Sequence, residues 1–538
     1  MNIERETYDH PEMSSDLDMS RFRMAKYPPK QLPYTTKSIC PVCLLDEREV
    51  NVIDATVFER DGQIMFEKEC PNHGVFEDIY WSDAAMFERV MNYWYMSLGL
   101  DNPRTQSIHG CPEDCGQCTN HLGHTALGLI DVTSRCNLSC SICFANAEGS
   151  GRTYEPEPDQ VLEMLKNLRS NLPAPCPAVQ FAGGEPTLSK NLPQYIKWAD
   201  ELGFRHIMVA TNGIRIAKNP KYLQQLVDAG LKTLYLQFDG ITEKPYITAR
   251  NIDLREVKNQ ALDSARTANL DGIILVPTVV KGVNDQELGS IIRYALDNRD
   301  IVRCINFQPV SITGRIEHEK RMAMRITTPD AIKLIEKQTN GRIRQSDWYP
   351  ISSMMGVGRA IGLMRGVNLF ELHSHFACGM ATFLFIGEDN TYYPITEVVD
   401  LEKLLITLEE ICNLYADGAR FPGLRSKVKL MKFLRHVRKK SFMKPVISSF
   451  LRSGSYSSLK VFMSKVIMLG IMHFQDPWNI DLERMKHCTI NYASPDGRII
   501  PFCTYNSIHR ERIESVYGLD AQMPLEKKIR TEMVTEMD

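Results

Sequence analysis

Three cysteines lie close together in the segment SRCNLSCSICF, residues 134–144. Thiolates at this spacing in one short loop can bind an iron–sulfur cluster. Cys136, Cys140 and Cys143 would hold three irons of a four-iron cluster and leave the fourth iron open to a substrate or cofactor. A cluster that only carries electrons normally has protein ligands on all four irons. The alternative is a structural zinc loop, which would need a fourth ligand.

A second group combines two short knuckles, Cys40-Pro-Val-Cys43 and Cys70-Pro-Asn-His73, on either side of a predicted β-hairpin. Four soft or borderline ligands of this kind form a closed tetrahedral site. The pattern resembles a rubredoxin or zinc-ribbon knuckle in which histidine replaces one cysteine. It predicts a mononuclear iron or zinc site, and the sequence leaves open whether the metal only folds a small domain or also transfers electrons.

A third group repeats the spacing of the first, and its members are Cys111, Cys115 and Cys118. It could hold an auxiliary 4Fe–4S cluster, with His121, His124 or a distant cysteine as the fourth ligand. A zinc loop or a set of core thiols is the alternative.

A fourth group is spread over the C-terminal part of the chain. The turn signal at residues 494–497 predicts a hairpin that brings Cys488 and Cys503 together. With Cys378 they would supply three ligands of another auxiliary cluster, and Cys412, Cys304 or a non-cysteine would be the fourth. Structural cysteines are an equally good interpretation.

The elements that would position the first group alternate between strands and helices. Six short apolar runs, rich in β-branched residues, are separated by segments with helical periodicity over residues 124–325. This alternation predicts an α/β fold with parallel strands and right-handed crossovers, in the form of a (β/α)6 partial barrel. The active site of such a barrel lies at the carboxyl ends of the strands. Glycine and polar residues follow the strands there, among them the GGEP segment at 183–186.

The rest of the chain divides into four further regions. Residues 1–37 are expected to be a flexible lead-in, 38–80 the metal knuckle domain, and 81–123 a helical segment with the third cysteine group. Residues 326–538 form a C-terminal domain. Within it, residues 426–470 are rich in Lys and Arg and hold no Asp or Glu, which is typical of a solvated helix pair or of an amphipathic membrane-surface helix.

Composition and charge limit the classes of protein to which the chain can belong. The chain has 538 residues and a formal net charge of −3, so overall charge gives no case for nucleic-acid binding. No apolar run reaches the roughly 18 residues of a membrane-spanning helix, and the start of the chain is polar. Cysteines clustered at metal-site spacing favour a reducing compartment, so we expect a cytoplasmic protein.

The CxxxCxxC motif after one strand, followed by a strand that ends in GGEP, resembles the radical S-adenosylmethionine (SAM) superfamily over roughly residues 124–310. The resemblance implies that the first cysteine group binds a 4Fe–4S cluster whose open iron holds SAM, which the reduced cluster cleaves to a 5′-deoxyadenosyl radical. It also implies SAM contacts from residues at the strand ends: Gly183, Gly184, Glu185, Asn212, Gln237, Asp239 and Gln308. The chain departs from the family at Ile142, where an aromatic residue is usual.

The layout of all four cysteine groups resembles the archaeal tetraether lipid synthase group from about residue 38 onward. That resemblance implies coupling of the terminal methyl carbons of archaeal diether lipids, a low-potential electron donor and contact with a membrane surface. Members of the same group are also described as radical SAM methyltransferases that act on a pterin in methanopterin biosynthesis, which is the alternative. A third hypothesis is an iron–sulfur electron carrier without catalysis, against which the open first cysteine group and GGEP argue.

Overall fold

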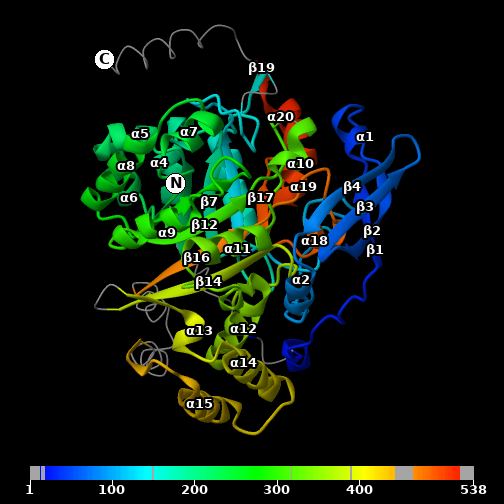
Figure 1. Ribbon diagram of the computed structural model, residues 1–538, viewed down its shortest axis with the longest axis vertical. Coiled ribbons are helices and arrows are strands. Elements are labelled where there is room, and N and C mark those ends of the chain that lie inside the picture. Colours follow the sequence, from blue (N-terminus) through cyan, green and yellow to red (C-terminus); the bar gives the residue numbers. More distant parts are fainter. Residues whose placement is uncertain are drawn as a thin grey trace.

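The computed structural model describes residues 13, 18–147, 151–316, 318–387, 391–442 and 465–520. Its elements form a small N-terminal antiparallel sheet, a large central sheet and a helical layer from the later part of the chain (Figure 1). The N-terminal sheet lies beside the C-terminal helix α18 (Leu482–Lys486), so segments far apart in sequence are neighbours in the fold.

The N-terminal sheet has four antiparallel strands in chain order. They are β1 (Tyr34–Ile39), β2 (Val52–Arg60), β3 (Gln63–Cys70) and β4 (Gly74–Trp81). Asp61 and Gly62 form the β2–β3 turn with φ of 53° and 75°, as a two-residue type I′ turn requires. This confirms the predicted hairpin. Helix α1 (Pro41–Leu45) starts within the first knuckle, where the Cys40 thiol accepts the backbone N–H of Cys43 at 3.4 Å.

The six predicted strands of the central sheet are confirmed as adjacent parallel strands. Their order is β5 (Leu127–Thr133), β7 (Ala178–Gly183), β8 (His206–Thr211), β9 (Thr233–Gln237), β10 (Gly272–Val276) and β12 (Val302–Pro309). The helices between them are α3 (Pro158–Arg169), α4 (Leu192–Glu201), α5 (Ile214–Lys218), α6 (Pro220–Asp228), α7 (Glu243–Arg250), α8 (Arg255–Thr267) and α9 (Leu288–Asp297).

The two faces of the central sheet differ in burial. Strand residues such as Phe181, Val209 and Leu234 pack with helix residues such as Leu165 and Ile292 into one apolar core. On β9, β10, β12 and β16, residues pointing the other way are only half-buried. Because successive side chains of a strand point to opposite faces, these half-buried residues lie on one face of the sheet, called the inner face below.

The central sheet continues beyond the six predicted strands. β16 (Val466–Met472) pairs in parallel with β12, and β17 (Ile490–Ala493) pairs in parallel with β5. β14 (Gly379–Ile386) and β18 (Ile499–Pro501) extend the two sides antiparallel, and three further short strands complete a 13-stranded sheet. The expected domain division at residue 325 is therefore too simple. Alternation of strands and helices cannot reveal a parallel partner that comes from far along the chain.

The remaining described elements are short strands and the helices of the later part of the chain. The strands are β6 (Arg152–Thr153), β11 (Thr278–Val279), β13 (Tyr349–Pro350), β15 (Tyr392–Pro394) and β19 (Leu519–Asp520). The helices are α2 (Ala84–Met91), α10 (Arg321–Met324), α11 (Thr328–Gln338), α12 (Met355–Arg365), α13 (Ile395–Val398), α14 (Leu401–Ala416), α15 (Pro422–Phe433), α19 (Phe502–Thr504) and α20 (Arg510–Tyr517).

Residues 18–24, expected to belong to a flexible lead-in, are packed against α12 and α14, and residues 34–37 belong to β1. The Phe22 side chain is 2% exposed, and the backbone N–H of Met24 donates to Asn413 Oδ1 at 3.1 Å. The prediction was wrong here because charge and proline content conceal these few apolar anchors. Residues 1–12 and 14–17 lie outside the described residues.

The basic stretch at 426–470 is not one helical segment. Its first residues belong to α15, its last residues belong to the buried strand β16, and residues 443–464 lie outside the described residues. The expected amphipathic segment is thus wrong for 466–470, because the strand packs Ile467 and Leu469 into the core. Among the described residues, no helix has the length and apolar character needed to cross a membrane.

Candidate functional site

The structure brings the four predicted ligands of the N-terminal domain together. The Nδ1 atom of His73 lies 3.4, 3.5 and 3.6 Å from the Sγ atoms of Cys43, Cys40 and Cys70, respectively. All four donor atoms lie within 4.8 Å of one another. Three thiols that converge on one imidazole nitrogen fit a single tetrahedral zinc or iron ion.

Two polar side chains orient these ligands from outside. Glu47 Oε1 lies 3.3 Å from the second ring nitrogen of His73. The Asn51 amide nitrogen lies 3.6 and 3.7 Å from the Sγ atoms of Cys43 and Cys70. A carboxylate behind a ligating histidine fixes the ring and its tautomer, and an amide N–H stabilises a thiolate.

We expect Glu47→Gln to weaken zinc binding by roughly 10-fold, at the low end for such supporting residues because Glu47 is exposed. Competition with a chromogenic chelator measures the affinity. Glu49→Gln, which changes an exposed carboxylate that accepts no hydrogen bond in this site, is the matched control. Equal affinities for the two variants would contradict the assigned role of Glu47.

The first cysteine group lies in the loop after β5, and its three thiols are half-buried. Arg250 Nη1 donates to the carbonyl of Ile142 at 2.6 Å, and Asn212 Nδ2 donates to Asn137 Oδ1 at 2.7 Å. Residues at the ends of neighbouring strands and helices thus hold the loop at two points. The donor set fits a cluster with one open iron, because the thiols stay accessible while their backbone is fixed.

Gly183 and Gly184 allow the end of β7 to pack against the start of this loop. A Cβ on Gly183, whose φ is 134°, would lie 2.1 Å from the carbonyl oxygen of Thr133. A Cβ on Gly184 would lie 2.4 Å from the carbonyl oxygen of Arg135. The backbone N–H groups of Gly184 and Glu185 donate to these two carbonyls, each at 2.8 Å. The close approach that requires glycine is therefore to the chain itself.

Glu185 uses both carboxylate oxygens inside the protein. Oε1 accepts from the hydroxyls of Thr187 at 2.6 Å and Thr211 at 2.7 Å, and Oε2 accepts from the backbone N–H of Asn212 at 2.8 Å. Burial raises the pKa of this carboxyl, and the hydrogen bonds oppose that rise. Glu185 thus fixes the position of Asn212, which in turn holds the cysteine loop.

Asp239 and Arg250 form a buried ion pair below the loop. Arg250 Nε and Nη2 donate to the two carboxylate oxygens of Asp239, both at 2.8 Å. Lys258 Nζ donates to the Asn212 carbonyl at 2.6 Å and to Gln237 Oε1 at 3.3 Å. Burial lowers the pKa of Lys258 to about 7. Gln237 and Asp239 therefore serve this network, with Arg250 linking it to the loop.

Gln308 points to a different group on the inner face of the sheet. Gln308 Nε2 and Asn306 Nδ2 donate to the Tyr235 hydroxyl at 2.7 and 2.5 Å. All three side chains are half-buried. They form a small accessible set of donors and acceptors, and Met468 of β16 lies across from Cys304 on the same sheet.

In the third cysteine group, the structure shows contact between two of the three thiols. Among the described residues, only the N-terminal knuckle has all its donor atoms within 4.8 Å of one another. Cys111 and Cys115 share a hydrogen bond that lowers the pKa of the first thiol and raises that of the second. Of the predicted fourth ligands, His124 has both ring nitrogens engaged: Nε2 accepts the Glu371 N–H at 2.9 Å, and Nδ1 lies 3.4 Å from the Gly99 carbonyl. Because both nitrogens of His124 have these partners, His121 or another residue is the candidate for the fourth ligand.

The cysteines of the C-terminal part separate into two kinds. Cys378 and Cys503 both contact the segment that follows β16: the His473 N–H donates to the Cys378 carbonyl at 3.1 Å, and the Gln475 N–H donates to the Cys503 sulfur at 3.3 Å. Cys378 is also among the groups that raise the pKa of Cys488. Cys412 packs in a separate apolar cluster with residues of α12, and Cys304 lies on β12 paired with Ile274. The structure does not bring either of these into the group.

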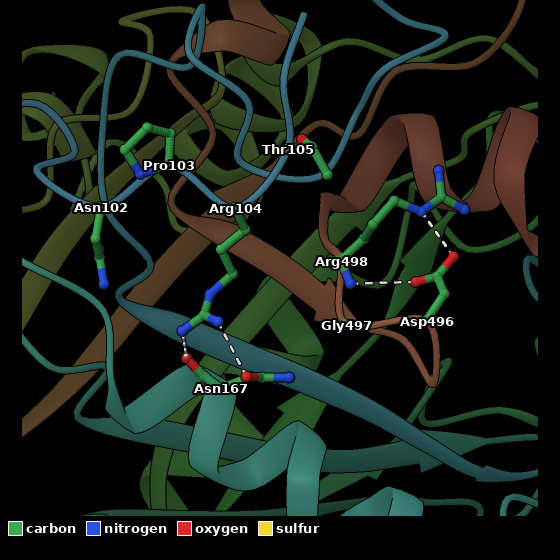
Figure 2. Close-up of a pocket in the computed structure, with 8 residues that line it drawn as sticks. All are labelled: Asn102, Pro103, Arg104, Thr105, Asn167, Asp496, Gly497 and Arg498. Carbon is green, nitrogen blue, oxygen red and sulfur yellow. Dashed lines mark hydrogen bonds and ion pairs between the residues drawn. The ribbon is translucent and has the colours of Figure 1, made fainter.

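An open pocket of about 400 Å³ lies behind the third cysteine group (Figure 2). Arg104 and Arg498 line it, and each is already engaged: Arg104 with Asn167 at 3.0 Å, and Arg498 with Asp496 at 2.7 Å. Arg498 also contacts the Cys115 carbonyl at 3.4 Å. This pocket is not next to the strand ends where the first cysteine group lies.

Sequence reasoning missed several residues of these sites, namely Arg250, Lys258, Tyr235 and Asn306. It also missed the buried Arg484, whose Nη2 donates to the His473 carbonyl at 3.0 Å. Arg250 and Lys258 lie on α7 and α8, two helices that the sequence analysis did not single out. Asn306 and Tyr235 had a usable signal, because a polar residue within an apolar strand marks a face that is not core. Nothing in the local sequence distinguishes Arg484 from a surface arginine.

Comparison with known families matches two parts of the chain. Residues 130–295 match the radical SAM superfamily, and residues 32–82 match a profile described as the HMPTM N-terminal zinc ribbon domain. The first range contains the first cysteine group and the carboxyl ends of the strands from β5 to β10, but not β12. The second contains the four-ligand knuckle site.

Individual proteins show similarity over different lengths. A 7,8-dihydro-6-hydroxymethylpterin dimethyltransferase of Methanocaldococcus jannaschii is 44% identical over 501 residues, 91% of this chain and 96% of that protein. A GTP 3′,8-cyclase of Nautilia profundicola is 31% identical over 186 residues, 33% of this chain and 55% of that protein. The solved structure of Streptococcus suis SuiB bound to precursor peptide SuiA covers 41% of this chain and 47% of its own, at 18% identity and a TM-score of 0.33.

Proposed function

The chain belongs to the radical SAM superfamily, in the group of the 7,8-dihydro-6-hydroxymethylpterin dimethyltransferase, and we propose that it methylates a pterin of this kind. The observation that carries the proposal is similarity at 44% identity over nearly the whole length of both chains. A 4Fe–4S cluster and SAM, the cofactors of the family, supply one-electron cleavage of SAM and a carbon radical that abstracts hydrogen.

This proposal corrects the expectation of lipid coupling. The full-length relative is named for a pterin, which is small, flat and polar, whereas the sequence analysis favoured a diether lipid as substrate. The expected lipid partner and membrane contact are overturned by the same finding. The two readings share the four cysteine groups, so those motifs could not separate them.

The roles proposed for the residues follow from their contacts. Cys136, Cys140 and Cys143 would hold the cluster, and Arg250 and Asn212 would fix their loop. The remaining two cysteine groups would hold auxiliary clusters. The half-buried amides and hydroxyl on the inner face would receive the polar edge of the pterin ring, because a ring with several donors and acceptors needs partners of both kinds.

We expect Asn306→Ala to raise KM for the pterin by roughly 10-fold to 100-fold, the cost of one or two lost hydrogen bonds in a desolvated site. SAM cleavage without substrate should be unchanged. Steady-state kinetics with a dihydropterin measure KM, and release of 5′-deoxyadenosine measures SAM cleavage. Met468→Leu, a volume-conserving change on a neighbouring strand of the same sheet, is the control, and an equal rise in both variants would contradict the assignment.

The decisive experiment is anaerobic reconstitution with SAM, a strong chemical reductant and 7,8-dihydro-6-hydroxymethylpterin. Mass spectrometry should find one or two added methyl groups on the pterin. SAM cleavage with an unmodified pterin would reject the substrate and leave the superfamily assignment. Absence of SAM cleavage in protein with a full iron content would reject the activity itself.

A further inference from the structure

The thiols of Cys378, Cys488 and Cys503 converge from three separate segments. Cys378 precedes β14, Cys488 follows α18, and Cys503 lies in α19. After burial itself, the neighbouring thiols are the groups that raise the pKa of Cys488 and Cys503, with Cys378 acting on both. The Cys503 sulfur also accepts the backbone N–H of Gln475 at 3.3 Å. Three thiols in mutual reach are one ligand short of a closed four-iron cluster.

A buried positive charge lies against this group. The Arg484 side chain is buried, and its guanidinium forms no ion pair with any carboxylate among the described residues. Its Nη2 donates to the carbonyl of His473 at 3.0 Å, and its Nε has no hydrogen-bond partner. Cys378 and Cys503 are among the groups that raise its pKa. Since buried charges are normally paired, an anion is expected at the thiols.

His473 lies directly opposite Cys378. Its backbone N–H donates to the Cys378 carbonyl at 3.1 Å, one step beyond the Gly379–Met472 pair of the β14–β16 ladder. Residues opposite one another in an antiparallel pair extend from the same face with Cβ atoms about 5 Å apart. The His473 side chain is 3% exposed, and neither ring nitrogen has a hydrogen-bond partner. A buried imidazole with two unpartnered nitrogens is costly unless it binds something.

The neighbouring histidines have other contacts. His375 Nδ1 accepts the backbone N–H of Ala377 at 3.2 Å. His487 Nε2 lies 3.6 Å from the Glu483 carboxylate. His121 Nε2 lies 3.1 Å from the Cys488 carbonyl. Both ring nitrogens of His487 also lack a hydrogen-bond partner, but its Nε2 faces the Glu483 carboxylate. Among these four histidines, His473 is the one whose backbone N–H donates to a cysteine of the group.

We propose that His473 is the fourth protein ligand of a four-iron cluster held by Cys378, Cys488 and Cys503, and that Arg484 is the buried counter-charge of this cluster. All four irons then have protein ligands, so this centre carries electrons and does not bind substrate. Histidine in place of cysteine makes the cluster less negative and raises its potential. The inference rests on the chain carrying iron–sulfur clusters and is independent of the pterin substrate.

Pulsed electron paramagnetic resonance of the reduced, full-length protein tests the proposal. In the absence of SAM, we expect a strong nitrogen coupling to one cluster, which changes to the isotope pattern of ¹⁵N when the histidines are labelled. The coupling should disappear in His473→Ala and in His473→Cys. Lack of any strong nitrogen coupling in the wild-type protein would overturn the assignment, as would its persistence in both variants.

His473→Cys also tests the ligand without loss of the cluster. It should keep the wild-type iron and sulfide content while the midpoint potential of this centre falls. His487→Ala is the matched control, because it removes a neighbouring buried ring and should keep the nitrogen coupling. Metal content of the N-terminal knuckle reports folding in every variant. These measurements do not depend on methylation of a pterin. A wrong assignment of His473 and a wrong assignment of the substrate would therefore give different results.

Discussion

Cys140→Ala is expected to lower SAM cleavage by at least about 1,000-fold, which corresponds to about 4 kcal/mol of barrier. The thiol lies in the loop after β5, and the Arg250 guanidinium opposes the rise in its pKa that burial causes. Loss of one of three thiolates leaves a four-iron cluster held by two, which is too few to retain it while one iron stays open to SAM. Anaerobic assay of 5′-deoxyadenosine, normalised to protein, measures the effect.

Cys412→Ala is the matched control for this variant. Cys412 is a buried cysteine that packs in an apolar cluster on α14 and belongs to none of the four cysteine groups. We expect near wild-type cleavage and an unchanged iron content. If Cys140→Ala kept the activity of the control, the first cysteine group would not be the SAM site.

Arg250→Met is expected to destabilise the protein by about 3–5 kcal/mol, the usual cost of breaking a buried ion pair from one side. The substitution leaves the Asp239 carboxylate, 1% exposed, without its two charged donors. It also frees the Ile142 carbonyl and so loosens the cysteine loop. We therefore expect a lower urea midpoint together with a reduced iron content after reconstitution.

The double variant Asp239→Asn/Arg250→Met separates the two effects. Removal of the stranded charge should recover part of the stability, because an unpaired buried carboxylate is the main cost. The iron content should stay low, since the contact with Ile142 is still absent. Equal stability of the single and double variants would show that the ion pair is not what Arg250 contributes.

The sequence predicted the parts of the fold that depend on local pattern. The six strands from β5 to β12 and the β2–β3 hairpin have apolar periodicity or turn residues of their own, and the structure confirms them. It did not predict β16 and β17 as partners of the barrel strands, because their parallel pairing depends on contacts far apart along the chain.

In the candidate site, too, the sequence predicted features with a local pattern and missed contacts between distant segments. Cysteine spacing identified the N-terminal knuckle that the structure assembles, since metal ligands must lie close together in space and often lie close in sequence. The other three cysteine groups stay predictions. The structural role of Glu185 could not be predicted from the sequence. Its carboxylate accepts hydrogen bonds from Thr187, Thr211 and Asn212, which only the folded chain brings together. The substrate class was misjudged because the four cysteine groups are compatible with both the lipid and the pterin.

Both flanks of the barrel are completed by strands that are synthesised last. One edge of β5 and one edge of β12 carry backbone donors and acceptors that pair with β17 and β16, respectively. While the chain emerges from the ribosome, these edges are open templates for pairing with other nascent chains. A chain truncated before residue 466 would lack β16 and β17, so the exposed edges of β12 and β5 would favour aggregation.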